Sequence, residues 1–181
     1  MIRTERLELV PATPPMVRAA MEGGSPLAAC LGVEAPASWP PLYLDTPALE
    51  FTLARLAEGP GQLDWWLHFV LLRASGRGAS RCLIGTAGFV GPPSTDGTVE
   101  VGYSILPEHQ RKGYATEAVR GMVTHSFAIA GVERVIAETL AELEPSIGVL
   151  RKCGFRPAAD PSSPEVIRFE LTRGMFESAG R

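Results

Sequence analysis

The stretch EHQRKGYATEA, residues 108–118, places two cations and one glycine just before a helical sequence. An alternating segment, TVEVGYSIL at residues 98–106, precedes it, and the helical pattern begins at about Thr116. The partial positive charge of a helix N-terminus disfavours cations by up to about 1 kcal/mol. Because Arg111 and Lys112 stand there nevertheless, we expect an anion from outside the chain to bind at this point.

A strand, a compact loop and a long helix together form a geometry that binds phosphate groups, because the N–H groups of the first helical turn point outward unpaired. Gly113 can adopt the backbone angles of a tight anion nest. From spacing alone, a solvated basic loop with a glycine turn is the alternative. The sequence contains no GxxxxGK[ST] motif, and GTAGFVG at residues 85–91 is not a dinucleotide fingerprint because a turn follows it.

These residues resemble the GNAT family of N-acetyltransferases. QRKGYA fits the family signature (Gln/Arg)-x-x-Gly-x-(Gly/Ala) through Gln110, Gly113 and Ala115. The wider text VEVGYSILPEHQRKGYATEAV, the later LRKCGF and the opening TERLELVPAT resemble the RimJ/RimL-type branch, which includes acetyltransferases of ribosomal-protein N-termini. The resemblance runs from about Thr4 to Thr172.

The resemblance implies a mixed α/β fold, with a central, mostly antiparallel twisted sheet of about seven strands and helices on both faces. It also implies acetyl-CoA as cosubstrate. The pyrophosphate would lie on loop amides, the pantetheine arm would pair with the splayed end of the strand near Ile105, and a backbone N–H there would act as the oxyanion donor. The coenzyme-binding residues so implied are Ser104, Ile105, Leu106, Gln110, Arg111, Lys112, Gly113, Tyr114, Ala115 and Thr116.

The implied reaction is attack of a primary amine on the acetyl thioester through a tetrahedral intermediate. Glu100, on the strand before the loop, is the expected base, and a glutamate held by hydrogen bonds on the strand face is the alternative. His68 and Glu138 are weaker candidates for the base. Ser146 is the expected acid toward the leaving thiolate, on the family pattern Asn-x-x-Ser/Ala, and a serine that satisfies local N–H groups at a helix start is its alternative.

Two leucines depart from the family pattern. Leu143 stands where the family often has the Asn, and Leu150 stands where many relatives have a tyrosine acid. The second departure leaves Ser146 as the acid. Both departures also support the alternative function of a non-catalytic acyl-CoA-binding module.

Four aromatic residues precede the loop in sequence. They either line an acceptor groove or belong to the core, and we favour the core because aromatic residues in strands are mostly buried. They are Trp39, Tyr43, Trp65 and Trp66.

The remaining chain predicts a β-meander followed by a β-helix-β-helix-β order in one domain, residues 1–181, with no repeat and no dividing linker. Alternating patterns predict strands at residues 6–10, 64–74, 82–91, 98–106, 133–140 and 165–172, with a turn at 75–81. Cap and stop residues predict helices at residues 11–24, 45–59, 116–131 and 144–155. The expected caps are Thr13, Asp45 or Thr46, and Gly131.

Composition limits the function classes. The chain has 181 residues, is 45% hydrophobic and carries a net charge of −3, which argues against nucleic acid as the main partner. No signal peptide and no apolar run of the ~20 residues that a membrane span needs is visible. Three cysteines without a CxxC spacing indicate a reduced, cytoplasmic protein with no metal. The expected partner is an amine acceptor, either a small molecule or a protein N-terminus, and the expected state is a monomer or homodimer.

Overall fold

A computed structural model describes residues 1–74 and 80–179, and its strands form one eight-stranded sheet. The order across the sheet is β1-β2-β3-β4-β5-β6-β8-β7. The strands are β1 (Ile2–Arg3), β2 (Leu7–Pro11), β3 (Leu67–Leu72), β4 (Cys82–Phe89), β5 (Thr98–Ile105), β6 (Arg134–Leu140), β7 (Arg156–Ala158) and β8 (Val166–Thr172). The predicted mixed α/β architecture is confirmed, and the very short β1 and β7 add to the predicted strands.

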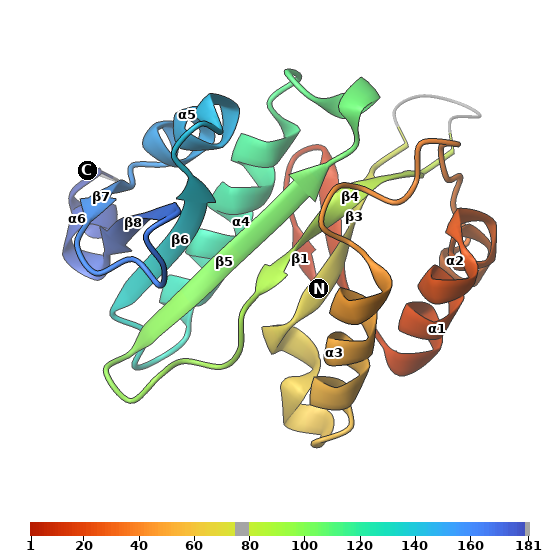
Figure 1. The fold of residues 1–181 in the computed structure, drawn as a ribbon, viewed down its shortest axis with the longest axis horizontal. Coiled ribbons are helices and arrows are strands. Elements are labelled where there is room, and N and C mark those ends of the chain that lie inside the picture. Colours follow the sequence, from red (N-terminus) through yellow and green to blue (C-terminus); the bar gives the residue numbers. More distant parts are fainter. Residues whose placement is uncertain (75–79, 180–181) are drawn as a thin grey trace.

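Helices cover both faces of this sheet, as predicted (Figure 1). On one face Val119 and Met122 of α4 are buried in a core that β4, β5, β6 and β8 share. On the other face α1, α2 and α3 bury Val17, Leu27 and Leu49 in the same core as Phe69 of β3. The helices are α1 (Pro14–Glu22), α2 (Gly24–Leu31), α3 (Thr46–Leu56), α4 (Tyr114–Ala128), α5 (Glu144–Lys152) and α6 (Arg173–Ala179), with the 3-10 helices η1 (Pro60–Trp65) and η2 (Pro107–His109).

The sheet opens between its two parallel strands. All neighbouring strands are antiparallel except β5 and β6, which pair only between Thr98–Glu100 and Arg134–Ile136. Beyond Glu100, β5 stays paired with β4 as far as Ile105, while β6 stays paired with β8. Figure 1 shows β5 and β6 diverging toward their arrowheads, with α4 behind the opening. The second half of β5 therefore presents one edge that no described strand covers.

Only one of the predicted helix caps is made by a side-chain hydrogen bond. The Asp45 side chain accepts the Ala48 N–H at 2.9 Å and begins α3, whereas Thr13 stands at the N-cap of α1 without a side-chain hydrogen bond. The predicted cap at Gly131 is wrong. Ile129 leaves the helical conformation first (ψ 128°) and packs against the core, so that α4 ends at Ala128.

Three regions differ from the sequence predictions. The strand predicted at residues 64–74 begins only at Leu67, because residues 64 and 65 belong to η1 and the Trp66 indole donates back to Gln62 at 2.9 Å. The segment after residue 24 forms α2, and α6 follows β8 without a predicted counterpart. The turn predicted at residues 75–81 lies mostly outside the described residues.

Candidate functional site

The loop between β5 and α4 has two left-handed residues. Arg111 has φ 61° although it carries a side chain, and Gly113 has φ 85° and ψ 0° at the N-cap of α4. Left-handed backbone is unfavourable for a residue with a Cβ, so the conformation at Arg111 must be held by its surroundings. Alternation of left-handed and other residues turns successive N–H groups toward one side, which is the geometry of an anion nest.

The N–H groups of this loop have no acceptor. Within residues 1–74 and 80–179, none of the backbone N–H groups of residues 111–116 donates a hydrogen bond, and the first one bonded is that of Glu117, to the Gly113 carbonyl at 3.0 Å. The side chains of Arg111 and Lys112 are exposed beside them. Unpaired N–H groups, the helix dipole and two cations together favour a polyanionic ligand such as a diphosphate.

Two residues predicted at the coenzyme make hydrogen bonds within the chain. The Gln110 amide donates to the Ile105 carbonyl at 2.8 Å and so closes the loop onto the end of β5. Leu106 is fully buried, and its N–H donates to the Ile84 carbonyl at 2.9 Å. These two hydrogen bonds hold the start of the loop against the ends of β5 and β4.

Backbone alternation decides which groups of β5 face the opening. The Val90 N–H donates to Glu100 and the Leu106 N–H donates to Ile84, so the even-numbered residues of β5 bond to β4. Because the backbone groups of an antiparallel strand alternate in direction, those of Tyr103 and Ile105 point toward the opening. Of the predicted stretch from Ser104 to Leu106, only Ile105 thus has an N–H that faces the opening.

Glu100 lies half-buried on β5, next to the point where β6 departs. No other described residue makes a hydrogen bond or ion pair with its carboxylate. Burial raises the pKa of Glu100, the Glu138 charge adds to that rise, and Arg168 opposes it. An unpaired carboxylate with a raised pKa is suited to accept a proton.

The two alternative bases are less suited. The Glu138 carboxylate accepts from the Ser162 N–H, the Ser162 hydroxyl and the Arg168 guanidinium; burial raises its pKa, but these partners together hold it below its usual value. His68 is 2% exposed, and burial lowers its pKa to about 4. Its ring packs against Phe89, which lies on the α4 face of the sheet, whereas Glu100 faces the other side.

Ser146 has a partner, Tyr103, that no sequence pattern predicts as such. The Tyr103 phenol oxygen lies 3.0 Å from the Ser146 hydroxyl and donates to the Ser146 carbonyl at 3.2 Å. Burial raises the pKa of Tyr103 to about 12, so the phenol keeps its proton at neutral pH. The sequence does contain a signal for a polar role here. Tyr103 carries the only hydroxyl on the otherwise apolar face of β5 formed with Val99, Val101 and Ile105.

The leucines at the departures from the family pattern contribute no polar group. Leu143 occupies the N-cap of α5 without a side-chain bond, and Leu150 is fully buried in the core. The preferred core assignment holds for Trp39 and Trp66, each 9% exposed, and Trp65 packs partly buried against both cores. Tyr43 differs, because it is 66% exposed in the loop before α3.

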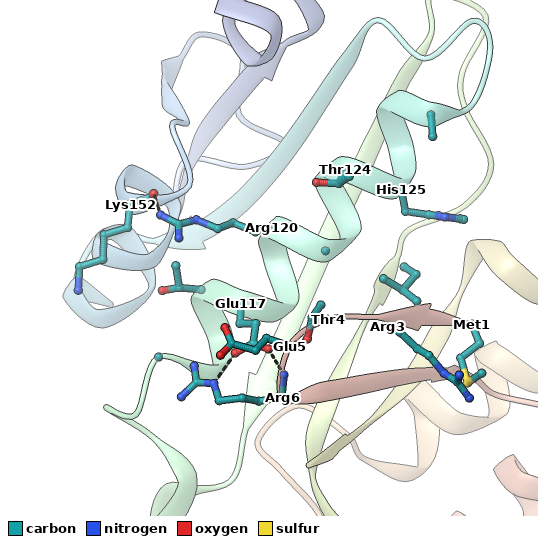
Figure 2. A pocket seen from close by; sticks show the side chains of 15 residues that line it. Met1, Arg3, Thr4, Glu5, Arg6, Glu117, Arg120, Thr124, His125 and Lys152 are labelled. Atoms are coloured by element: carbon teal, nitrogen blue, oxygen red, sulfur yellow. Dashed lines mark hydrogen bonds and ion pairs between the residues drawn. The ribbon is translucent and has the colours of Figure 1, made fainter. Parts of the chain in front are cut away.

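A cavity of about 920 Å³ follows the outer side of α4 from Gly113 to Ala128 and is bordered by the N-terminal residues. Figure 2 shows Thr4 and Arg6 beside Glu117 at the end of this cavity that adjoins the loop. In the described part of the chain no three His, Cys, Asp or Glu side chains gather as metal ligands would. Nor is any helix there both long and apolar enough to cross a membrane.

Comparison with known proteins relates this geometry to a family. A family model described as an acetyltransferase (GNAT) domain matches residues 39–156. The uncharacterised N-acetyltransferase YoaA of Bacillus subtilis (strain 168) is 38% identical over 74 residues, which are 41% of this chain and 42% of that protein, so the match spans less than half of either. An acetyltransferase structure of the GNAT family from Bacillus anthracis superposes with a TM-score of 0.60 at 22% identity, over 94% of this chain and 97% of the other. Spermidine N-acetyltransferase from Vibrio cholerae, solved with CoA and spermine, gives 0.64 at 15% identity, over 96% and 99% of the two chains.

Proposed function

The chain belongs to the GNAT acetyltransferase family, and from this premise we propose that it transfers the acetyl group of acetyl-CoA to a primary amine. The observation that carries the proposal is the row of acceptor-free N–H groups at residues 111–116, next to the uncovered edge of β5. A diphosphate and an amide-containing arm are the ligand chemistry that fits this pair of features.

The donor site uses backbone groups more than side chains. The N–H groups of residues 111–116 would hold the pyrophosphate, with Arg111 and Lys112 adding full charges. The outward N–H and carbonyl groups of Tyr103 would pair with the pantetheine amides in place of a strand. When bound, acetyl-CoA supplies a thioester, an acyl group that amines attack directly.

Glu100 is the base in this proposal. An ammonium has no lone pair, so the amine must first lose a proton, and Glu100 receives it directly or through water. The demand is small for a peptide α-amine, with a pKa of about 7.7–8.0, and larger for a lysine near 10.4. The Ile105 N–H, which faces the opening, is the oxyanion donor.

Ser146 and Tyr103 form the acid in this proposal. The Ser146 hydroxyl donates toward the sulfur that leaves, and the Tyr103 phenol beside it can replace that proton. The phenol stands in for the tyrosine that many relatives carry where this chain has Leu150.

A protein N-terminal α-amine is the acceptor we place first, because the loop and strand motifs resemble the RimJ/RimL-type branch. Polyamines are the alternative, since a protein of similar fold is a spermidine N-acetyltransferase solved with spermine. A second candidate function, an acyl-CoA-binding module without catalysis, is favoured by the nonpolar residues at 143 and 150.

Thiol release from acetyl-CoA, followed colorimetrically with a panel of amines, tests the proposal. Peptides with varied N-termini, lysine peptides, polyamines and aminoglycosides form the panel. Release that depends on one class establishes the enzyme and its acceptor. If no amine of the panel causes thiol release but acetyl-CoA still raises the melting temperature, the binding module is favoured. If acetyl-CoA causes neither thiol release nor a rise in melting temperature, the donor site itself is contradicted.

A further inference from the structure

Glu117, in the first turn of α4, is bound by the turn between β1 and β2. The Arg6 N–H donates to Glu117 Oε1 at 2.7 Å and the Arg6 Nε donates to Oε2 at 2.6 Å. The Thr4 hydroxyl donates to Oε1 at 2.6 Å. Figure 2 shows the three side chains meeting at the start of α4. A segment more than a hundred positions away in sequence thus holds the first turn of the helix.

The Arg6 guanidinium also contacts the anion loop. Its Nη1 donates to the Lys112 carbonyl at 3.1 Å, and its centre lies 4.7 Å from the centroid of the Tyr114 ring. A Cβ placed on Gly113 would come within 3.3 Å of Arg6 Nη2. Arg6 therefore contacts Lys112 and Tyr114 and lies beside Gly113 between them, in the segment that carries the free N–H groups.

The contact with the Lys112 carbonyl fixes the direction of a donor. A trans peptide is planar, so the carbonyl of Lys112 and the N–H of Gly113 point in opposite directions. Because Arg6 binds that carbonyl, the Gly113 N–H is turned away from Arg6. The loop needs such a restraint because Arg111 holds a left-handed conformation that is unfavourable for its side chain.

We propose that Arg6 is a positioning residue that presets the loop of residues 111–115 for the diphosphate of acetyl-CoA. This inference rests on the proposed function. Arg6 acts through the Lys112–Gly113 peptide and through Glu117, and the affinity for the coenzyme depends on it although it need not touch the ligand.

Amide hydrogen exchange of the ligand-free protein tests the restraint. In Arg6→Ala we expect the amide of Glu117, whose N–H donates to the Gly113 carbonyl of the loop, to exchange about tenfold faster than in the wild type, because the bonds of Arg6 to Lys112 and Glu117 are lost, while the amides of β3 and β4 keep their rates. Arg73→Ala is the matched control. Arg73 donates to the Thr4 and Glu5 carbonyls at 3.2 and 3.0 Å, holding the same turn from its other side without reaching the loop.

Titration calorimetry and kinetics test the consequence. We expect Arg6→Ala to weaken the binding of acetyl-CoA and of inorganic pyrophosphate about tenfold. The KM for acetyl-CoA should rise by the same factor, and kcat at saturation should stay unchanged. Arg6→Lys, which keeps the charge but not the planar fork, should recover only part of the affinity.

An unchanged exchange rate of the Glu117 amide in a folded Arg6→Ala protein would overturn the inference, as would an equal loss of affinity in Arg73→Ala. Failure of the wild type to bind acetyl-CoA would instead overturn the proposed function, and the exchange of the ligand-free variants would still decide whether Arg6 restrains the loop.

Discussion

The Tyr103 phenol oxygen lies 3.0 Å from the Ser146 hydroxyl and thereby joins β5 to the first turn of α5. β5 lies on one side of the opening in the sheet, and α5 follows directly on the strand of the other side. The contact thus sets a polar pair where the two halves of the sheet part. Since Leu150 is buried without a polar group, this pair is the acid that our mechanism uses.

Tyr103→Phe should lower kcat about tenfold, since a positioned acid contributes that much or more. We expect the Kd for acetyl-CoA to stay within about twofold of the wild type, because the backbone of β5 and not the phenol faces the pantetheine. If Tyr103 and Ser146 act as one relay, the double variant of Tyr103→Phe and Ser146→Ala should be as active as the less active of the two single variants. Independent, additive losses in steady-state kinetics would contradict the relay.

The sequence predicted those parts of the site that are local in the chain. The anion loop was found because its glycine, its cations and the helix start lie within a few residues, and the preceding strand showed its alternation. The contacts that join distant segments were not predicted: Tyr103 with Ser146 is separated by 43 positions and Arg6 with Glu117 by 111. No local pattern encodes such pairs, because they arise only when the sheet and helices pack.

The family signature also did not predict how Gln110 is used. Its amide binds the Ile105 carbonyl, although the motif suggested a coenzyme contact. Similarly, the family resemblance implies coenzyme contacts along the whole stretch Ser104–Leu106, whereas strand pairing with β4 leaves only the backbone groups of Ile105 in that stretch facing the opening. Backbone direction depends on the partner strand, which the sequence of one strand does not specify.

Glu100→Gln should lower kcat/KM by about tenfold to a hundredfold, with the larger loss for acceptors of high pKa. Burial raises the pKa of Glu100, so the base form is gained only as the pH rises past a value above the usual glutamate pKa of about 4.3. The wild-type pH–rate profile should therefore show an acid limb above that value. The limb should vanish in the glutamine variant, and a profile unchanged by the substitution would move the role of base to another group.

The same substitution should stabilise the folded protein at neutral pH. A carboxyl whose folded pKa is raised contributes stability below its unfolded pKa and loses it as the pH rises through the folded pKa. Glu100→Gln removes that loss, so urea midpoints should rise at pH 7.5 and change little at pH 4.

Glu138→Gln is the control, because its expected change in folding stability at neutral pH has the opposite sign. Its partners hold the pKa of Glu138 below the usual value, so its stabilisation is present above the unfolded pKa and fades in acid. This variant should be less stable than the wild type at pH 7.5. Destabilisation by both substitutions would indicate that Glu100 also has a partner in solution.

Gly113→Ala should weaken acetyl-CoA binding about tenfold, because a left-handed alanine costs about 1–2 kcal/mol and its Cβ meets Arg6 at 3.3 Å. The control is Gly148→Ala, inside α5, where an added Cβ has no described atom within 4 Å and helix propensity improves. Calorimetry with acetyl-CoA should separate the two variants. Normal binding by folded Gly113→Ala would contradict the assignment of the loop.

Gly102→Val tests where the acceptor approaches. Gly102 is exposed between Glu100 and Ser104 on β5, faces away from α4, and leaves open space within 4 Å of an added Cβ. If the amine crosses this face to reach Glu100, valine should raise the acceptor KM at least about fivefold and leave the acetyl-CoA KM unchanged.

The contrast with Gly85→Ala shows why an effect at Gly102 would be informative. A Cβ on Gly85 would lie 2.2 Å from the Ser104 carbonyl oxygen, so that substitution should displace β5. It should therefore lower the stability of the protein together with kcat/KM for acetyl-CoA and for the acceptor. Gly102→Val should keep the wild-type melting temperature, and its kinetic change would then report access and not folding. An unchanged KM for both peptides and polyamines would place the acceptor path away from this face of β5.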